Sequence, residues 1–151
     1  MCGWRCQKKG GQAAQALGRS RGGFSTKIHI SVDALGNPLR LILTAGQSHD
    51  STQAEALIAG YDFERLIADK SYDVAALLQI IAAAGAEAVI PPRANRKAQR
   101  DYDEHLYKER HVVECFINKI KHYRRIFSRF EKLAKRYLSF LSFASALIWL
   151  R

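Results

Sequence analysis

The run from Phe24 to Val32 alternates in side-chain character, which limits the folds open to this chain. A period of two predicts a half-buried β-strand. The residues of the expected buried face are Phe24, Thr26, Ile28, Ile30 and Val32. Turn-forming residues at 33–38 precede a second apolar run at 39–44. The two runs therefore predict a β-hairpin joined by a loop.

Short strands and helices are expected to alternate after this hairpin. In order, the sequence predicts a helix over 53–59, a strand over 65–68, a helix over 74–84, a strand over 87–90, a long helix from about 104 into the basic segment, and an apolar terminal helix. Asp50, Ser51 and Thr52 are candidate caps for the first helix, and Asp73 is the candidate cap for the second, which Gly85 is expected to end. This order predicts an α/β fold with a mixed sheet.

Basic residues are concentrated at the two ends of the chain, which has 151 residues and a formal net charge of +10. Residues 1–27 hold six basic residues and no acidic one, and the glycine-rich part at 1–23 predicts a basic arm or loop. Residues 28–118 hold nine basic and thirteen acidic residues, whereas 119–136 hold eight basic residues and one acidic residue. This distribution favours a polyanionic partner, with a merely solvated basic helix as the alternative.

Cysteine content and hydropathy exclude several classes of protein. Cys2, Cys6 and Cys115 cannot form a disulfide framework, and zinc is disfavoured because the next Cys or His after Cys6 is His29. The apolar run at 138–150 spans 13 residues, whereas a membrane-spanning helix needs about 20. We therefore expect a cytoplasmic protein with no membrane partner.

Four polar residues are spaced to share one side of the long helix. At about 100° per residue, the side chains of Tyr107, Arg110, Glu114 and Lys121 fall within about 60° of one another. Such a stripe is either a solvated row of ion pairs or an aligned catalytic edge. Asp69 ends a predicted strand, where α/β sheets usually place their ligands, although an ordinary turn Asp is the alternative.

The spacing Tyr107-x2-Arg110-x3-Glu114-x6-Lys121 resembles the Y-R-E-K signature of bacterial insertion-sequence transposases of the DDE type. Further matching segments are Gly18–His29, Ala68–Asp73, Val89–Pro92 and Ile148–Leu150. The resemblance extends from about residue 7 to residue 151, so it covers nearly the whole chain.

The resemblance implies a ribonuclease-H-like mixed sheet flanked by helices over residues 24–151, and DNA transposition by metal-dependent strand cleavage and strand transfer. It implies that Asp69 and Glu114 are catalytic and hold Mg²⁺ or Mn²⁺. The expected DNA-binding residues are Tyr107, Arg110, Lys121, Arg124 and Arg125. The implied partners are transposon-end and target DNA, with a second copy of the chain or an N-terminal transposase part as further candidates.

One part of the family pattern is absent from this sequence. The family places its first catalytic Asp on a central strand upstream of the segment that begins at Gly18, and no acidic residue precedes Gly18 here. Asp33 is the nearest acidic residue in order, but it falls in the expected hairpin turn, which the family does not use for catalysis. We therefore expect the first central strand to be missing, which would split the sheet and leave two unpaired edges.

Three hypotheses for the function follow. The first is the C-terminal catalytic portion of a DDE transposase that is inactive alone. The second is a non-catalytic DNA-binding or regulatory fragment that relies on the basic segment at 119–136. The third is a decayed remnant without a function.

Overall fold

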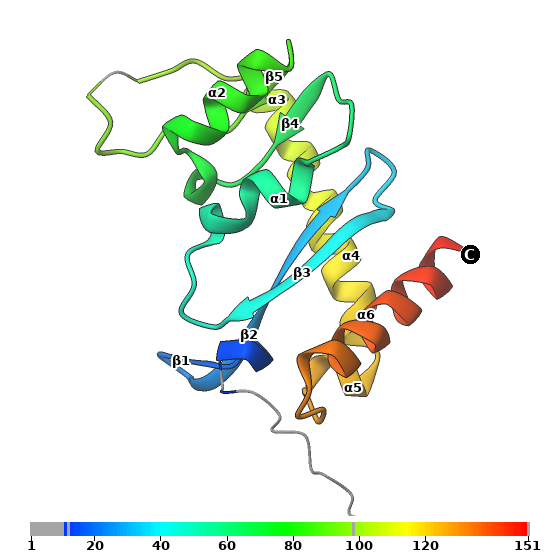
Figure 1. Ribbon diagram of the computed structural model, residues 1–151. Coiled ribbons are helices and arrows are strands. Elements are labelled where there is room, and N and C mark those ends of the chain that lie inside the picture. The colour runs from blue at the N-terminus through cyan, green and yellow to red at the C-terminus, as the bar shows by residue number, and fades with distance from the viewer. Residues whose placement is uncertain (1–10, 12, 98, 151) are drawn as a thin grey trace, which may run out of the picture.

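The computed structural model describes residue 11, residues 13–97 and residues 99–150, and shows a mixed α and β chain (Figure 1). Its strands are β1 (Gly18–Ser20), β2 (Gly23–Val32), β3 (Pro38–Ala45), β4 (Arg65–Ile67) and β5 (Glu87–Val89). Its α-helices are α1 (Ala54–Ile58), α2 (Ala75–Ala83), α3 (Glu104–Tyr107), α4 (His111–Lys121), α5 (Arg124–Phe127) and α6 (Ala134–Trp149). Its short 3-10 helices are η1 (Ala13–Gln15), η2 (Asp50–Gln53), η3 (Lys70–Tyr72) and η4 (Lys108–Arg110).

The described strands form two separate sheets. β1, β2 and β3 make an antiparallel sheet in that order, whereas β4 and β5 make a parallel pair. β2 and β3 pair from Thr26 opposite Ala45 to Ile30 opposite Leu41, and the register shifts after Ser31. The α/β content and the division of the strands into two sheets are both as the sequence predicted.

The predicted hairpin is present, and Asp33 organises its turn. The Asp33 carboxylate accepts hydrogen bonds from the backbone N–H groups of Leu35 at 2.9 Å and Asn37 at 2.8 Å. Gly36 has a φ of +86°, a left-handed conformation that glycine adopts without a steric penalty. Asp33 therefore has a structural role in the turn.

A short strand precedes the hairpin where the sequence predicted only a loop. β1 pairs antiparallel with Gly23–Ser25, and the tight turn between the strands places Gly23 at a φ of +104°. This pairing needs backbone groups and a permissive glycine, and no apolar run, which explains why side-chain patterning missed it.

Both predicted helix caps were wrong. The residue that caps η2 is His49, whose ring Nδ1 accepts the N–H of Ser51 at 3.3 Å. Asp73 does not cap α2, because its carboxylate is buried against arginines from another segment. Gly85 follows the end of α2 with a φ of +69°, as the sequence predicted.

The long basic helix predicted from residue 104 is interrupted. α3, η4 and α4 follow one another to Lys121 because the residues that join them keep helical backbone angles. Tyr123 then adopts an extended backbone, α5 has four residues, and 128–133 are not helical. The basic segment is therefore divided among the end of α4, α5, a loop and the start of α6, and a single basic helix does not form.

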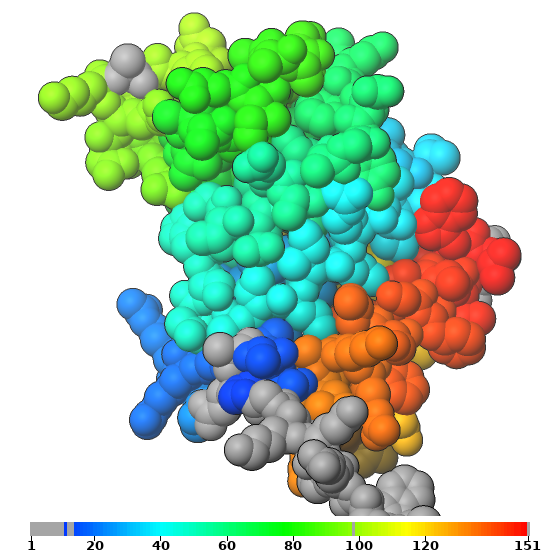
Figure 2. All heavy atoms as spheres, in the orientation of Figure 1, coloured from blue at the N-terminus to red at the C-terminus, as the bar shows by residue number. Residues whose placement is uncertain are grey.

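Each sheet has its own hydrophobic core. One core lies between the β2–β3 face and α4, α5 and α6, and consists of Phe116, Ile120, Ile126, Tyr137, Leu141 and Ala144. The other joins α1 and α2 to the β4–β5 pair, and consists of Ala54, Ile58, Leu77, Ile81 and Ile90. The α2–β5 unit and the α5–α6 unit lie at opposite ends of the molecule (Figure 2).

The predicted apolar terminal helix is present as α6, which has 16 residues. Leu141 on its inner side is fully buried, whereas Phe143 on its outer side is exposed. In the described part of the chain, no helix is long and apolar enough to cross a membrane.

Candidate active site

Asp69 is the second residue after the end of β4 and directly precedes η3. Its side chain is exposed and does not cap the helical turn that follows. Within the described residues its carboxylate has no hydrogen-bond or ion-pair partner. Asp69 is therefore an exposed carboxylate close to the end of a strand, and this position is the one that the sequence predicted.

Three residues of the predicted polar stripe are in contact. Arg110 Nη2 donates a hydrogen bond to Glu114 Oε1 at 2.5 Å, and the Arg110 guanidinium carbon lies 5.8 Å from the centre of the Tyr107 ring. Separations of three and four residues on a nearly continuous helix place these side chains on one side. Lys121 is exposed at the end of α4, about 10 Å further along the axis at 1.5 Å per residue. Cys115, next to Glu114, carries an exposed thiol.

The negative charge of Asp69 affects the pKa values of two residues in this stripe. Burial raises the pKa of the Tyr107 phenol, and the negative charge of Asp69 raises it further. Burial lowers the pKa of Arg110, but the hydrogen bond and charge of Glu114, together with Tyr107 and Asp69, raise it above its usual value. The fold therefore brings the two predicted carboxylates, which are far apart in sequence, towards one guanidinium.

Tyr72 is a neighbour of Asp69 that the sequence analysis missed. Burial, followed by the charges of Asp50 and Asp69, raises the pKa of Tyr72 to about 12. Asp50 in turn pairs with Lys27 of β2 at 3.0 Å, so the first half of β2 lies on the Asp69 side of the molecule. The sequence signal for Tyr72 was its place in the matching segment Ala68–Asp73.

A buried carboxylate anchors a basic loop beside the site. The Asp73 side chain is fully buried, accepts a hydrogen bond from Arg96 Nε at 2.6 Å and pairs with Arg100 Nη1 at 3.4 Å. The Arg93 N–H also donates to Asp73 at 2.9 Å, and its guanidinium donates to the Ser71 carbonyl at 2.7 Å. Burial raises the pKa of Asp73, but these hydrogen bonds and the guanidinium charges outweigh it and lower the pKa. The sequence analysis missed this cluster.

Arg124 and Arg125 lie beyond the helix break, away from the Arg110 cluster. The Arg124 guanidinium carbon lies 5.8 Å from the centre of the Phe130 ring, and that of Arg125 lies 4.9 Å from the centre of the Phe140 ring. Arg125 also pairs with Glu131 at 3.5 Å. Phe130 is exposed, so this end of the molecule presents aromatic and basic groups together.

The donor chemistry at Asp69 and Glu114 suits a hard divalent cation. Mg²⁺ is commonly held by one or two carboxylates together with water and substrate phosphate. The described residues contain no group of three or more acidic, His or Cys residues placed to hold a metal ion. The carboxylate oxygens of Asp69 and Glu114 are of the ligand type that Mg²⁺ takes, and any ion bound to them needs further ligands.

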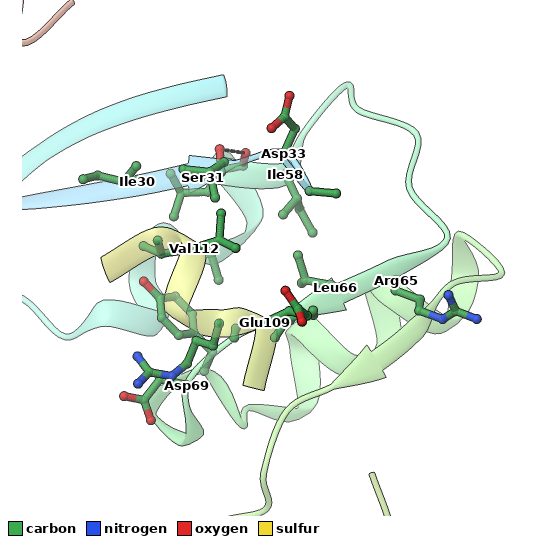
Figure 3. Close-up of a pocket in the computed structure, with 18 of the residues that line it drawn as sticks. Ile30, Ser31, Asp33, Ile58, Arg65, Leu66, Asp69, Glu109 and Val112 are labelled. Carbon is green, nitrogen blue, oxygen red and sulfur yellow. Dashed lines mark hydrogen bonds between the residues drawn. The ribbon is translucent and has the colours of Figure 1, made fainter. Parts of the chain in front are cut away.

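A pocket of about 580 Å³ opens beside Asp69 (Figure 3). It lies between the second half of β2 and β4, and α1 and α4 complete its walls. Lining residues include Ile30, Val32, Leu57, Ile58, Leu66 and Val113. β2 passes from Ile30 to Asp33 in the direction opposite to β4, which passes from Arg65 to Asp69 (Figure 3).

Comparisons with known proteins agree on one family. The family described as the transposase DDE domain matches residues 3–149. A Brucella ovis protein named as the transposase for insertion sequence element IS6501 is 43% identical over 130 residues, which are 85% of this chain and 100% of the relative. A Burkholderia cepacia protein named as the transposase for insertion sequence element IS402 is 33% identical over 135 residues, which are 82% of this chain and 62% of the relative. No solved structure matches the chain at comparable significance.

Proposed function

Because this chain belongs to the DDE transposases of insertion sequences, we propose that it is the C-terminal portion of a catalytic domain that cuts and joins DNA at transposon ends. The observation that carries this proposal is the convergence of Asp69 with the Tyr107–Arg110–Glu114 cluster. The proposed reaction is metal-dependent phosphoryl transfer. Because its substrate is DNA, it would take place at the bacterial nucleoid.

Asp69 and Glu114 are the residues that would hold Mg²⁺ or Mn²⁺ in this proposal. When bound at such carboxylates, a divalent ion activates the attacking water or 3′-hydroxyl and stabilises the leaving oxygen. Asp69 has no competing partner among the described residues, whereas Glu114 is bonded to Arg110. Glu114 must therefore exchange or share this bond when it binds a cation.

Arg110 and Tyr107 are suited to hold a DNA phosphate near these carboxylates. A guanidinium can donate two parallel hydrogen bonds to a phosphate. The raised pKa of Tyr107 keeps its phenol protonated, so that it remains a hydrogen-bond donor. Lys121, Arg124 and Arg125 would contact phosphates further along the duplex, where such contacts position the DNA without reading its sequence.

We further propose that the two sheets are the halves of a ribonuclease-H-like sheet, and that the first catalytic carboxylate comes from an N-terminal transposase part. Two observations support this view: the division of the described strands into two sheets, and the absence from the described residues of a group of three side chains placed to hold a metal ion. The chain alone should then be inactive.

Strand transfer on transposon-end DNA with Mg²⁺ tests the proposal. In a transposase that joins this chain to its N-terminal part, Asp69→Asn and Glu114→Gln should each abolish cleavage while DNA binding persists. Asp62→Asn, which removes an exposed loop carboxylate, is the matched control and should leave cleavage intact. Unchanged cleavage in either site variant would remove that residue from the site, and activity of the 151-residue chain alone would refute its incompleteness.

The aromatic and basic groups around α5 favour a second candidate, a DNA-binding fragment without catalysis. Exposed Phe130 beside Arg124 offers a ring for base stacking next to a phosphate-binding cation. This candidate predicts that the chain binds DNA strongly, and that Asp69→Asn and Glu114→Gln alter neither DNA binding nor DNA cleavage.

A further inference from the structure

We propose that the basic loop at residues 93–100 is a contact surface for DNA phosphates beside Asp69, and that the buried carboxylate of Asp73 positions this loop. This inference rests on the proposed function, because it specifies where the DNA of that reaction is held. It adds contact residues outside both the polar stripe of α3 and α4 and the arginines of α5. Residue 98 lies outside the described part of the loop.

The loop is strongly basic and projects from the molecule. Its charged residues are Arg93, Arg96, Lys97 and Arg100, and it contains no acidic residue. In the described part of the chain, Asp73 is the one acidic side chain that pairs with them. A net positive charge therefore remains on the loop, and such a surface attracts nucleic-acid phosphates. In Figure 2 the yellow-green loop projects at the upper left.

The start of the loop is fixed to the helical turn that follows Asp69. η3 begins at the residue directly after Asp69. The Arg93 guanidinium donates hydrogen bonds to the backbone carbonyls of Lys70 at 3.3 Å and Ser71 at 2.7 Å, both of which belong to η3. The Arg93 N–H donates to the Asp73 carboxylate at 2.9 Å. The loop is therefore held against the turn that begins next to the proposed cation ligand.

The end of the loop leads to the polar stripe. Arg100 Nη2 donates a hydrogen bond to the Ile90 carbonyl at 2.7 Å, so the loop closes on the residue after β5. Two residues after Arg100, the ring of Tyr102 lies edge-on to the ring of Tyr107, with 5.7 Å between the ring centres. Tyr107 in turn lies against the Arg110 guanidinium. DNA held by Tyr107 and Arg110 would therefore lie beside the loop.

The basic residues of the loop have two different functions. Arg93 and Arg100 donate to backbone carbonyls, so they fix the loop. Arg96 donates to Asp73 through Nε at 2.6 Å, and within the described residues neither its Nη groups nor the exposed Lys97 ammonium has a partner. A guanidinium can donate two parallel hydrogen bonds to a phosphate. Arg96 and Lys97 are therefore the residues that contact DNA.

Asp73 holds this arrangement together. Its fully buried carboxylate accepts hydrogen bonds from the Arg93 N–H and Arg96 Nε, and pairs with Arg100 Nη1 at 3.4 Å. The same residue directly follows η3, so it joins the loop to the turn next to Asp69. Because it is buried, Asp73 acts on DNA only through the arginines, as a positioning residue.

Salt-dependent binding of a fluorescently labelled DNA duplex tests the contact. With the 151-residue chain, Lys97→Gln and Arg96→Gln should each reduce the slope of log affinity against log salt by about 1, because each removes one phosphate contact. Lys97 is exposed, so its replacement leaves the fold intact. Arg65→Gln is the matched control and should leave the slope unchanged. It also removes one positive charge, but Arg65 begins β4, at the end opposite to Asp69, and pairs with Glu87.

Asp73→Asn separates positioning from net charge. The substitution adds one positive charge to the chain, which by itself would strengthen DNA binding. We expect the affinity to fall by about threefold or more instead, because binding must then order the loop. Asp62→Asn adds the same charge at an exposed position and should not weaken binding. Far-ultraviolet circular dichroism confirms that each variant is folded under the conditions used.

A combined variant distinguishes positioning from a loss of stability. Lys97→Gln should change the salt slope less in the Asp73→Asn background than in the parent, because the loop no longer holds Lys97 beside the DNA. A purely structural role of Asp73 would leave the two effects additive, and this outcome would overturn the positioning role.

Three other outcomes would overturn the inference: no DNA binding by the parent chain, unchanged slopes in both Lys97→Gln and Arg96→Gln, or tighter binding by Asp73→Asn. Unchanged slopes would make the loop an ordinary solvated surface. Loss of cleavage in Asp69→Asn together with unchanged slopes would keep the proposed function and remove the loop from the DNA interface. Reduced slopes together with unchanged cleavage in Asp69→Asn would keep the loop contact and remove Asp69 from the catalytic site.

Discussion

At the scale of single residues, the negative charge of Asp69 acts on two half-buried phenols, Tyr72 and Tyr107. Burial is the larger cause of their raised pKa values, and the Asp69 charge adds to it. Asp69→Asn should therefore lower the pKa of both phenols, because a nearby negative charge disfavours the phenolate. Ultraviolet titration, with Tyr72→Phe and Tyr107→Phe to assign each transition, measures the change.

Asp62→Asn is the control for this titration, because Asp62 is exposed and contributes to neither pKa. For Tyr72, the direction in which stability changes with pH follows from its pKa, which is about 12 in the folded chain and therefore above the usual 10. The neutral phenol contributes stability that is complete below about pH 10 and is lost as the pH rises through about 12. Identical titrations for Asp69→Asn and the parent would contradict the close placement of Asp69.

The buried Asp73 carboxylate gives a second prediction at this scale. Asp73→Asn keeps the shape of the side chain but removes the charge that pairs with Arg96 and Arg100. We expect a loss of about 1–3 kcal/mol in the free energy of unfolding at neutral pH, measured by urea denaturation. Because the folded pKa of Asp73 is lowered, its contribution is present above the usual carboxyl pKa and is lost as the pH falls through the folded value.

The stability difference between the parent and Asp73→Asn should therefore shrink only in acid. Asp62→Asn again serves as the exposed control and should change the stability by less than about 0.5 kcal/mol. Equal stability of the parent and Asp73→Asn at neutral pH would show that the cluster of arginines contributes nothing to the fold.

At the scale of elements, α6 shows that the buried side of a helix contributes more to the free energy of unfolding than its exposed side. Leu141 is fully buried between the helices and the β2–β3 sheet, whereas Phe143, two residues later, is 64% exposed. Leu141→Ala should lower the free energy of unfolding by about 2–5 kcal/mol. Phe143→Ala should change it by less than about 0.5 kcal/mol. Equal effects in urea denaturation would mean that α6 does not pack as described.

The elements that the sequence predicted well are those whose own side chains specify them. The alternation over 24–32 and the glycine at 85 act locally, so the hairpin and the end of α2 were predicted correctly. The break at Tyr123 and the cap at His49 depend on the fold around them, and propensity alone does not specify such features. β1 was missed because its pairing relies on the backbone.

The same distinction applies to the candidate site. The contacts among Tyr107, Arg110 and Glu114 follow from helical periodicity, so the spacing was sufficient to predict them. The approach of Asp69 to this group joins segments that lie far apart in the chain. The resemblance to a family predicted it, whereas the residue pattern alone did not. Neither helical periodicity nor the resemblance predicted the ion pair between Arg96 and Asp73, because the side chains of a polar loop follow no repeating pattern.

At the scale of the whole molecule, the two arginines of α5 lie in a different part of the fold from Asp69. Arg124 and Arg125 lie beyond the break after α4, and Asp69 follows β4 in the other half of the fold. DNA bound to both would therefore extend along the molecule. Binding of this kind releases counterions, so the affinity should fall steeply with salt.

The double variant Arg124→Ala and Arg125→Ala should reduce the slope of log affinity against log salt by about 2, because two phosphate contacts are lost. Fluorescence anisotropy with labelled transposon-end DNA at several salt concentrations measures the slope. Arg65→Ala is the control, because Arg65 is already paired with Glu87 at 3.0 Å on the β4–β5 pair. An unchanged slope in the double variant would exclude α5 from the DNA interface.

The exposed thiol of Cys115 has a practical consequence for following this chemistry. Cys115 is next to Glu114 on α4, so a spin label or fluorophore attached to it would report from beside a proposed cation ligand. Cys2 and Cys6 are the other cysteines of the sequence, and replacing them with serine would make the attachment selective. A paramagnetic Mn²⁺ ion bound to the carboxylates would then broaden the spin-label spectrum. Cation binding could therefore be followed in real time and without a DNA cleavage assay.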